Sequence, residues 1–198
     1  MKKQLISIIF MALMISLSMC INTKDINGDT GKYIGNLDNK NYINNSNNNT
    51  IYLNISGNIV ELPLRASVKE ALSTELINTS DSDILRHYLT TKIIYFEYNK
   101  SLPSEEGMVS ITDLSMKLGF LNSIYPHEIV DDSVFNNESE IERVKNSNIT
   151  MIIKIIRSNS TAKIVRVNRT FVIEGNSLKE LDKAETRFVL AIYTGLAK

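Results

Sequence analysis

One stretch of the sequence gathers residue types that commonly bind metals. His127, Glu128, Asp131 and Asp132 lie within six positions, and their imidazole and carboxylate groups could hold a divalent cation. A metal site usually needs three or more ligands at fixed geometry, and no second histidine stands four residues from His127. We therefore interpret the stretch as a solvated acidic loop and expect no metal.

The common catalytic motifs do not occur in the sequence. There is no G-x-S-x-G motif, and the eight glycines form neither GxGxxG nor GxxxxGK[ST]. His87 stands in an expected short helix, and we interpret it as structural. An acid and base pair among Glu97, Asp113, Glu128 and Asp131 would require the fold to bring two of them together. The sequence gives no reason to expect a cofactor, and it favours a non-enzymatic role without deciding the question.

The N-terminus indicates export and attachment to a membrane. Lys2 and Lys3 precede an uncharged, mainly apolar run from Leu5 to Met19, which is the pattern of a signal peptide. The run is shorter than the roughly 20 residues that a spanning helix needs. Cys20 follows the run directly, so we predict that residues 1–20 are a signal peptide, a lipoprotein signal or a membrane anchor. The alternative for this lone cysteine is an incidental position at the end of an uncleaved anchor.

Asparagine is frequent and creates acceptor sites for N-glycosylation. With 22 asparagines, chance predicts about four Asn-x-Ser/Thr motifs, and the sequence holds about twice that number. The alternative is that the motifs reflect only the asparagine-rich composition. The candidates for glycosylation are Asn78, Asn137, Asn148, Asn159 and Asn168.

Composition and length limit the class of protein. The 22 Lys and Arg residues balance the 22 Asp and Glu residues, so we expect no nucleic-acid partner. The length of 198 residues suits one domain and a tail. Residues 21–49 are rich in asparagine and poor in large aliphatic residues, which predicts a disordered linker. Residues 50–198 are predicted to form the globular domain.

Hydrophobic periodicity and turn residues place the elements that would position any site. In the first part of the domain they predict a hairpin of residues 51–55 and 59–64, helices at 67–78 and 82–89, a strand at 92–98, and a helix capped by Thr112. Parallel pairing is expected between the strand at 59–65 and the strand at 92–98, because a helix separates them.

The sequence of the second part of the domain indicates which strand lies at the centre of the sheet. Residues 149–156 are nearly all apolar, which is typical of a strand that is covered on both faces. Strands at 163–167 and 170–174 would follow as a three-stranded antiparallel meander, and Ser177 would cap a C-terminal helix. We therefore predict an α/β fold: a single domain whose mixed sheet has helices packed on it and which ends in the antiparallel meander and the C-terminal helix.

A family resemblance supports this fold. The segment KIVRVNRTFVIEGNSLKELDKAETRFVLAIYTG resembles the ending of uncharacterised exported lipoproteins of methanogenic and related archaea, as does Pro63-Leu64-Arg65 before the first helix. The start of the chain resembles a lipobox, in which Cys20 would become the lipid-bearing first residue, although Met19 stands where that motif has Gly, Ala or Ser. The resemblance implies a fold and an envelope location, and it transfers no active-site residues.

These observations favour a membrane-tethered protein of the cell envelope that faces the cell exterior. Its N-terminus would contact the membrane, and its domain would bind an envelope or surface-layer protein or support assembly. Two alternatives stay open, an extracytoplasmic hydrolase-like enzyme and a small-solute-binding lipoprotein. A pocket with convergent polar groups would favour these alternatives.

Overall fold

A computed structural model describes residues 33–37, 40–45, 49–97, 104–135 and 137–197. All described residues belong to one compact unit, Gly31–Lys198. The predicted signal segment and Cys20 therefore lie outside the described residues.

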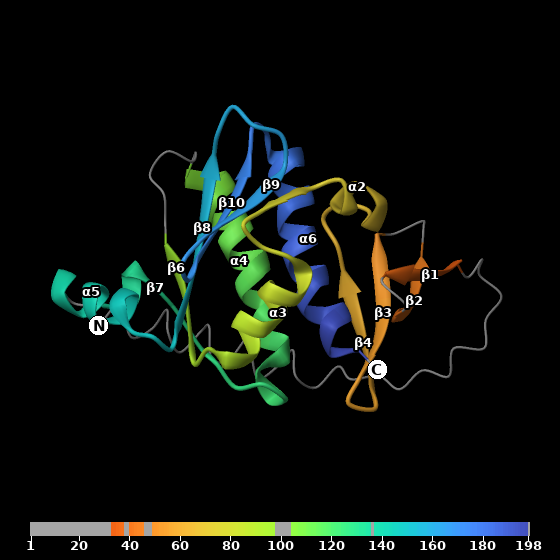
Figure 1. Cartoon of the computed structure of the whole chain (residues 1–198), viewed down its shortest axis with the longest axis horizontal. Coiled ribbons are helices and arrows are strands. Elements are labelled where there is room, and N and C mark those ends of the chain that lie inside the picture. Colours follow the sequence, from red (N-terminus) through yellow and green to blue (C-terminus); the bar gives the residue numbers. More distant parts are fainter. Residues whose placement is uncertain (1–32, 38–39, 46–48, 98–103, 136, 198) are drawn as a thin grey trace. The chain divides into compact units, whose positions relative to one another are not determined.

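The described strands form two sheets (Figure 1). One is a four-stranded antiparallel sheet in the order β1-β2-β3-β4, and the other is a six-stranded mixed sheet in the order β5-β9-β10-β8-β6-β7. The strands are β1 (Tyr33–Leu37), β2 (Lys40–Asn45), β3 (Thr50–Ile55), β4 (Asn58–Pro63), β5 (Glu75–Ile77), β6 (Ile93–Glu97), β7 (Glu128–Asp131), β8 (Thr150–Arg157), β9 (Lys163–Val167) and β10 (Thr170–Gly175).

The helices connect these strands or cover them. The helices are α2 (Val68–Leu72), α3 (Asp81–Thr90), α4 (Ser104–Phe120), α5 (Glu138–Asn146) and α6 (Leu178–Leu196), with single 3-10 turns at Leu121–Ser123 and Asp132–Val134. The predicted α/β fold, with helices on a mixed sheet and a C-terminal helix, is confirmed.

The predicted hairpin of β3 and β4 is confirmed. Ser56 and Gly57 have φ angles of 53° and 87°, which is the left-handed backbone that a tight two-residue hairpin turn requires. Pro63 closes β4, which is the edge strand of its sheet, where a residue without an N–H group does not interrupt a ladder.

The central position predicted for residues 149–156 is also confirmed, but the three-stranded meander is not formed. Strand β8 lies between β10 and β6 and pairs with both in parallel. Only β9 and β10 form an antiparallel hairpin, whose turn residue Asn168 has a φ of 57°. The chain passes over β10 after β8, because the connection at 158–162 is long enough to cross one strand, and β9 then joins the far side.

Three expectations for the first half of the domain need correction. The helix predicted at 67–78 ends at Leu72, and the chain then forms β5, whose backbone pairs with the otherwise open edge of β9. The strands predicted at 59–65 and 92–98 lie in different sheets, so they do not pair. The helix expected to begin at Thr112 begins at Ser104, which places Thr112 inside α4.

Strands β1 and β2 lie within the segment predicted as a linker, residues 21–49. Strand β2 pairs with β3 through Ile43 and Tyr52, so the antiparallel sheet extends into this segment. Backbone hydrogen bonds form such a ladder whatever the side chains are, and an asparagine-rich composition does not prevent it. Residues 21–32 of the predicted linker lie outside the described residues.

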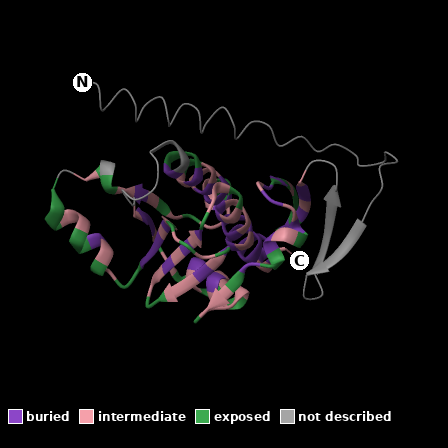
Figure 2. Ribbon diagram, turned by 90° about the horizontal axis from the view of Figure 1, so that it is seen from above, coloured by how far each residue is buried: buried purple, intermediate pink, exposed green. Residues whose placement is uncertain are grey.

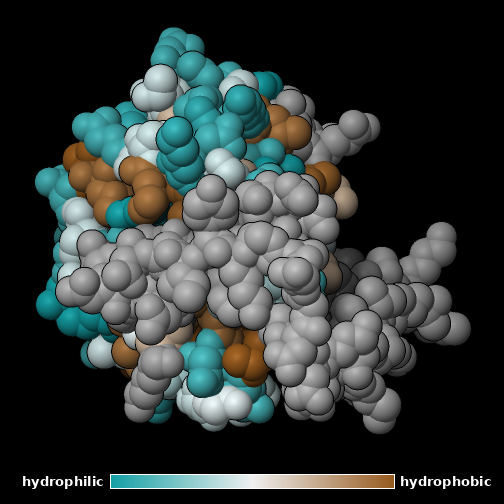
Figure 3. Space-filling model, turned by 90° about the vertical axis from the view of Figure 1, so that its right-hand side faces the viewer, coloured by the Kyte–Doolittle hydropathy of each residue, from teal (hydrophilic) through white to brown (hydrophobic). Residues whose placement is uncertain are grey.

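Helix α6 unites the two sheets in one hydrophobic core. Its buried residues include Phe188 and Ile192, which belong to the same apolar cluster as Ile51 of β3 and Ile153 of β8. Burial is concentrated in the centre of the domain (Figure 2). On the face seen in Figure 3, apolar side chains form separate patches among hydrophilic ones wherever the atoms are coloured.

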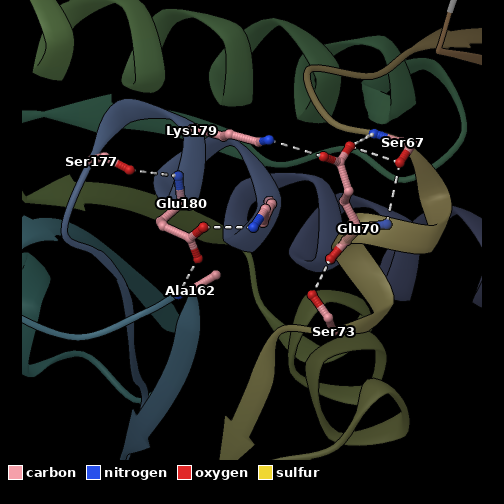
Figure 4. A network of polar contacts seen from close by, with 8 residues as sticks. Ser67, Glu70, Ser73, Ala162, Ser177, Lys179 and Glu180 are labelled. Carbon is pink, nitrogen blue, oxygen red and sulfur yellow. Dashed lines mark hydrogen bonds and ion pairs between the residues drawn. The ribbon is translucent and has the colours of Figure 1, made fainter.

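Polar side chains cap the N-termini of α2 and α6 (Figure 4). Ser67 and Glu70 form a capping box, in which each side chain accepts a hydrogen bond from the backbone N–H of the other. Ser177 caps α6 by accepting from the N–H of Glu180. The Glu180 carboxylate does not complete a second box, because it accepts from the backbone N–H of Ala162 at 2.8 Å instead.

Candidate functional site

The acidic stretch around His127 does not converge on a common point. The ring nitrogens Nδ1 and Nε2 of His127 lie 2.6 and 2.9 Å from the backbone oxygens of Tyr125 and Tyr88. Asp132 accepts a hydrogen bond from the hydroxyl of Tyr95. Within the described ranges no group of three or more His, Cys, Asp or Glu side chains is arranged to hold a metal ion.

The other candidates for acid and base chemistry have separate environments. His87 packs edge-on against Phe171 with 5.5 Å between ring centroids, and burial, followed by the neighbouring Arg166, lowers its pKa. Glu97 lies 3.1 Å from Lys154 and 3.7 Å from Lys145. Glu128 is exposed at the start of β7 and Asp131 at its end is partly buried.

A charged cluster that periodicity did not single out lies between α4, α6 and the segment before α2. Two cation–anion pairs and one isolated acid make up this buried cluster, together with a serine. Its members are Arg65, Ser110, Asp113, Lys117, Asp182 and Glu185.

Each cation of the buried cluster contacts one carboxylate. Arg65 Nε lies 2.6 Å from Asp182 Oδ1, a close ion pair without hydrogen-bond alignment, and Lys117 Nζ lies 2.5 Å from Asp113 Oδ2. The Lys117 side chain is only 6% exposed, so its pair with Asp113 is screened less by solvent than a surface ion pair. Burial raises the pKa of Asp182, and Arg65 opposes that shift.

Glu185 is the unpaired member of the buried cluster. It is 1% exposed, and neither of its carboxylate oxygens has a hydrogen-bond partner among the described residues; the same holds for the hydroxyl of the fully buried Ser110. Burial raises the pKa of Glu185 to about 7, and Ser110 and Arg65 oppose the shift only in part. With two cations and two paired anions beside it, the cluster is electrically neutral when Glu185 carries its proton.

A cavity of about 470 Å³ adjoins the cluster on the outer side of α4. Its lining is mainly apolar, with one charged residue from each ion pair at its rim. The lining residues are Arg65, Met108, Val109, Thr112, Asp113 and Met116. Met108 and Val109 are 63% and 50% exposed, and they place two adjacent apolar side chains at the edge of this cavity.

This arrangement favours binding over proton transfer to a substrate. Glu185 has the pKa of a general base, but its oxygens are covered and it does not line the cavity. The sequence does indicate that Glu185 is buried, because this residue lies in the apolar stripe of α6, four residues after Leu181 and three before Phe188. The partners Arg65 and Asp182 carry no such signal, since their pairing joins distant parts of the chain.

The predicted glycosylation sites are all at the surface of the described domain. Cys20 lies outside the described residues, so its lipidation stays a prediction. The exposed asparagines of the candidate motifs are Asn78, Asn137, Asn148, Asn159 and Asn168.

The fold and the buried cluster thus define a single α/β domain with a binding surface on α4 as its best candidate site. Comparison with known protein sequences then shows the family to which the chain belongs. It is similar to the uncharacterised protein MJ0259 of Methanocaldococcus jannaschii, with 39% identity over 215 aligned positions that cover 98% of each chain. The chain belongs to the family of this archaeal protein.

Two further comparisons found no match. No protein-family profile and no solved structure matches the chain. Among the described residues, no helix has both the length and the apolar character needed to cross a membrane.

Proposed function

We propose that the protein is a membrane-tethered, extracytoplasmic lipoprotein of the cell envelope, and that its domain binds an envelope or surface-layer protein through the outer face of α4. The observation that carries the binding role is the exposure of Met108 and Val109 beside the cavity on α4. The apolar run from Leu5 to Met19 and the cysteine that follows it support the tether.

The chemistry of the α4 cavity fits a protein partner. Methionine and arginine are enriched at protein interfaces, and the flexible methionine side chain adapts to the shape of a partner. Met108 and Met116 supply the apolar contact, while Arg65 and Asp113 supply a polar rim. Both rim charges are already paired within the domain, so they are fixed in position and do not need a charged ligand.

Site-specific photo-crosslinking on intact cells tests this proposal. A photoreactive residue replaces Thr112, which is exposed and lines the cavity, in the full chain expressed in an archaeal host. We expect one discrete adduct with an envelope protein, which is reduced when Met108→Glu is added. A photoreactive residue at Leu89, which is 45% exposed on α3, is the matched control. Equal crosslinking at both positions would contradict the proposed surface.

A small-solute-binding lipoprotein is the second candidate. The cavity of about 470 Å³ is large enough for a small molecule, but it is open to solvent and does not enclose one. Its open position on the helix surface and its mainly apolar lining fit a solute less well than a protein. Thermal stabilisation of the protein by a low-molecular-mass extract, abolished by Met116→Glu, would support solute binding.

A further inference from the structure

We infer that Asn159 is an N-glycosylation site of this protein and the acceptor that the fold presents most openly. The inference rests on the proposed function, because a chain must reach the exterior to be glycosylated there. Asn159 lies in the connection from β8 to β9, at the top of the view in Figure 1. An N-linked glycan is bulky and needs an acceptor in a surface loop.

Hydrogen bonds of the backbone to β10, α6 and β5 hold both ends of this connection in place. At one end, the N–H of Ser158 donates to the oxygen of Gly175 at 3.0 Å. At the other end, the N–H of Ala162 donates to Glu180 Oε2 at 2.8 Å, and the oxygen of Ala162 accepts from Glu75 at 3.1 Å. Residues 159–161 therefore form a tip that can move without loss of any strand pairing.

Both reactive parts of the motif lie free at that tip. Asn159 and Thr161 are exposed, and neither side chain forms a hydrogen bond within the described domain. A transferase has to take the asparagine and the hydroxyl residue into its own active site. The Asn159 motif can leave the surface at little cost in free energy, because no hydrogen bond of either side chain is broken and only the N–H of Ser160, which donates to Ser158 Oγ at 3.2 Å, has to be released.

Two other acceptor asparagines use their own side chains in the fold. Asn137 Oδ1 accepts hydrogen bonds from the N–H of Glu140 at 2.9 Å and from the hydroxyl of Ser139 at 2.7 Å. Asn54 Oδ1 accepts from the N–H of Gly57 at 3.0 Å in the turn of the first hairpin. Transfer to either asparagine would first break a helix cap or a turn contact.

Two further motifs have their hydroxyl residue held by the fold. Thr150, which belongs to the Asn148 motif, is 1% exposed. Ser80, which belongs to the Asn78 motif, caps α3 by accepting from the N–H of Asp83 at 3.2 Å.

The Asn168 motif is held by strand pairing. Its Thr170 lies in β10, which pairs with β9 on one side and β8 on the other. Among the candidate motifs of the described domain, the Asn159 motif is the one without such a restraint.

The donor for this reaction is a sugar linked to a lipid phosphate. The bond between the sugar C1 and the phosphate oxygen breaks, and the oxygen keeps the electron pair. A new bond forms between C1 and Asn159 Nδ2, which gives up one proton, and the released lipid phosphate takes up that proton. No oxidant or reductant is needed.

Peptide mass spectrometry of the full chain tests the inference. The chain is expressed in an archaeal host whose own surface glycoprotein, analysed in parallel, confirms that glycosylation is active. We expect a glycan on the peptide that contains Asn159, its loss in Asn159→Gln and Thr161→Ala, and its retention in Thr161→Ser. Asn168→Gln is the matched control, and it should leave that glycan unchanged.

Two results would overturn the inference, and they differ in what else they refute. If protease added to intact cells cleaves the chain but Asn159 is unmodified, the inference alone is wrong. If the chain is protected inside the cell and carries no glycan, the proposed location is wrong as well.

Discussion

Replacing Glu185 by glutamine should change the pH dependence of stability. The substitution keeps the shape of the side chain and removes its ability to ionise. In the folded protein the pKa of Glu185 is raised from 4.5 to about 7 by burial, so folding favours the protonated acid. The native protein therefore has its full stability below pH 4.5 and loses part of it as the pH rises through about 7.

The expected magnitude follows from the size of that shift. One pKa unit corresponds to about 1.4 kcal/mol, so a change from 4.5 to about 7 gives about 3 kcal/mol between low and high pH. The unpaired groups of the glutamine amide lower the unfolding free energy by an amount that does not depend on pH. This amount therefore cancels when two pH values are compared. The raised pKa of Asp182 acts in the same direction in both proteins, so only the part that comes from its repulsion of Glu185 differs between them.

Urea unfolding of the purified proteins at pH 5 and pH 8 measures this effect. Relative to the native chain, Glu185→Gln should gain about 2 to 3 kcal/mol of unfolding free energy between the two pH values. Glu128→Gln, at an exposed position on β7, controls for the loss of one negative charge. Parallel pH profiles for the native chain and Glu185→Gln would refute the assignment of Glu185 as a buried, unpaired acid.

Two further predictions concern the backbone. A Cβ at Gly175 would meet the backbone N of Leu181 at 2.6 Å, whereas a Cβ at Gly195 would meet the flexible end of Leu85 at 2.4 Å. Gly175→Ala should therefore lower the unfolding free energy, measured by urea unfolding, by about 1 to 3 kcal/mol more than Gly195→Ala does. The reverse order would contradict the packing of β10 against α6. At Asn168, whose φ is 57°, glycine should be tolerated and valine should cost on the order of 1 kcal/mol. Equal stability of these two variants by thermal unfolding would mean that no left-handed turn residue is needed there.

The sequence predicted those parts of the fold that depend on local pattern. Alternation of apolar residues placed the β3 and β4 hairpin and the two strands beside the last turn, and Ser177 marked the start of the last helix. The partner of β8 could not be predicted in the same way, because periodicity reports which faces are buried and not which strand lies beside them. The connection at 158–162 could close a hairpin or cross β10, since about five residues span well over the roughly 10 Å between next-nearest strands.

Less of the candidate site could be predicted from the sequence. Glu185 in the apolar stripe of α6 gave a signal, whereas its environment depends on Arg65 and Asp113, which come from other elements. Ion pairs across long sequence separations leave no spacing pattern in one sequence. The stretch at His127 illustrates the converse, because residues close in sequence can be directed to different partners.

The measurement that most directly tests the proposed role is the location of the full chain and of its Cys20→Ser variant in an archaeal host. We predict that the native chain is in the membrane fraction, carries a lipid on Cys20 by intact mass, and is cleaved by protease added to intact cells. Cys20→Ser should lose the lipid, while the nearby control Ser18→Ala should keep it. A native chain found without lipid in the soluble cytoplasmic fraction would contradict the account.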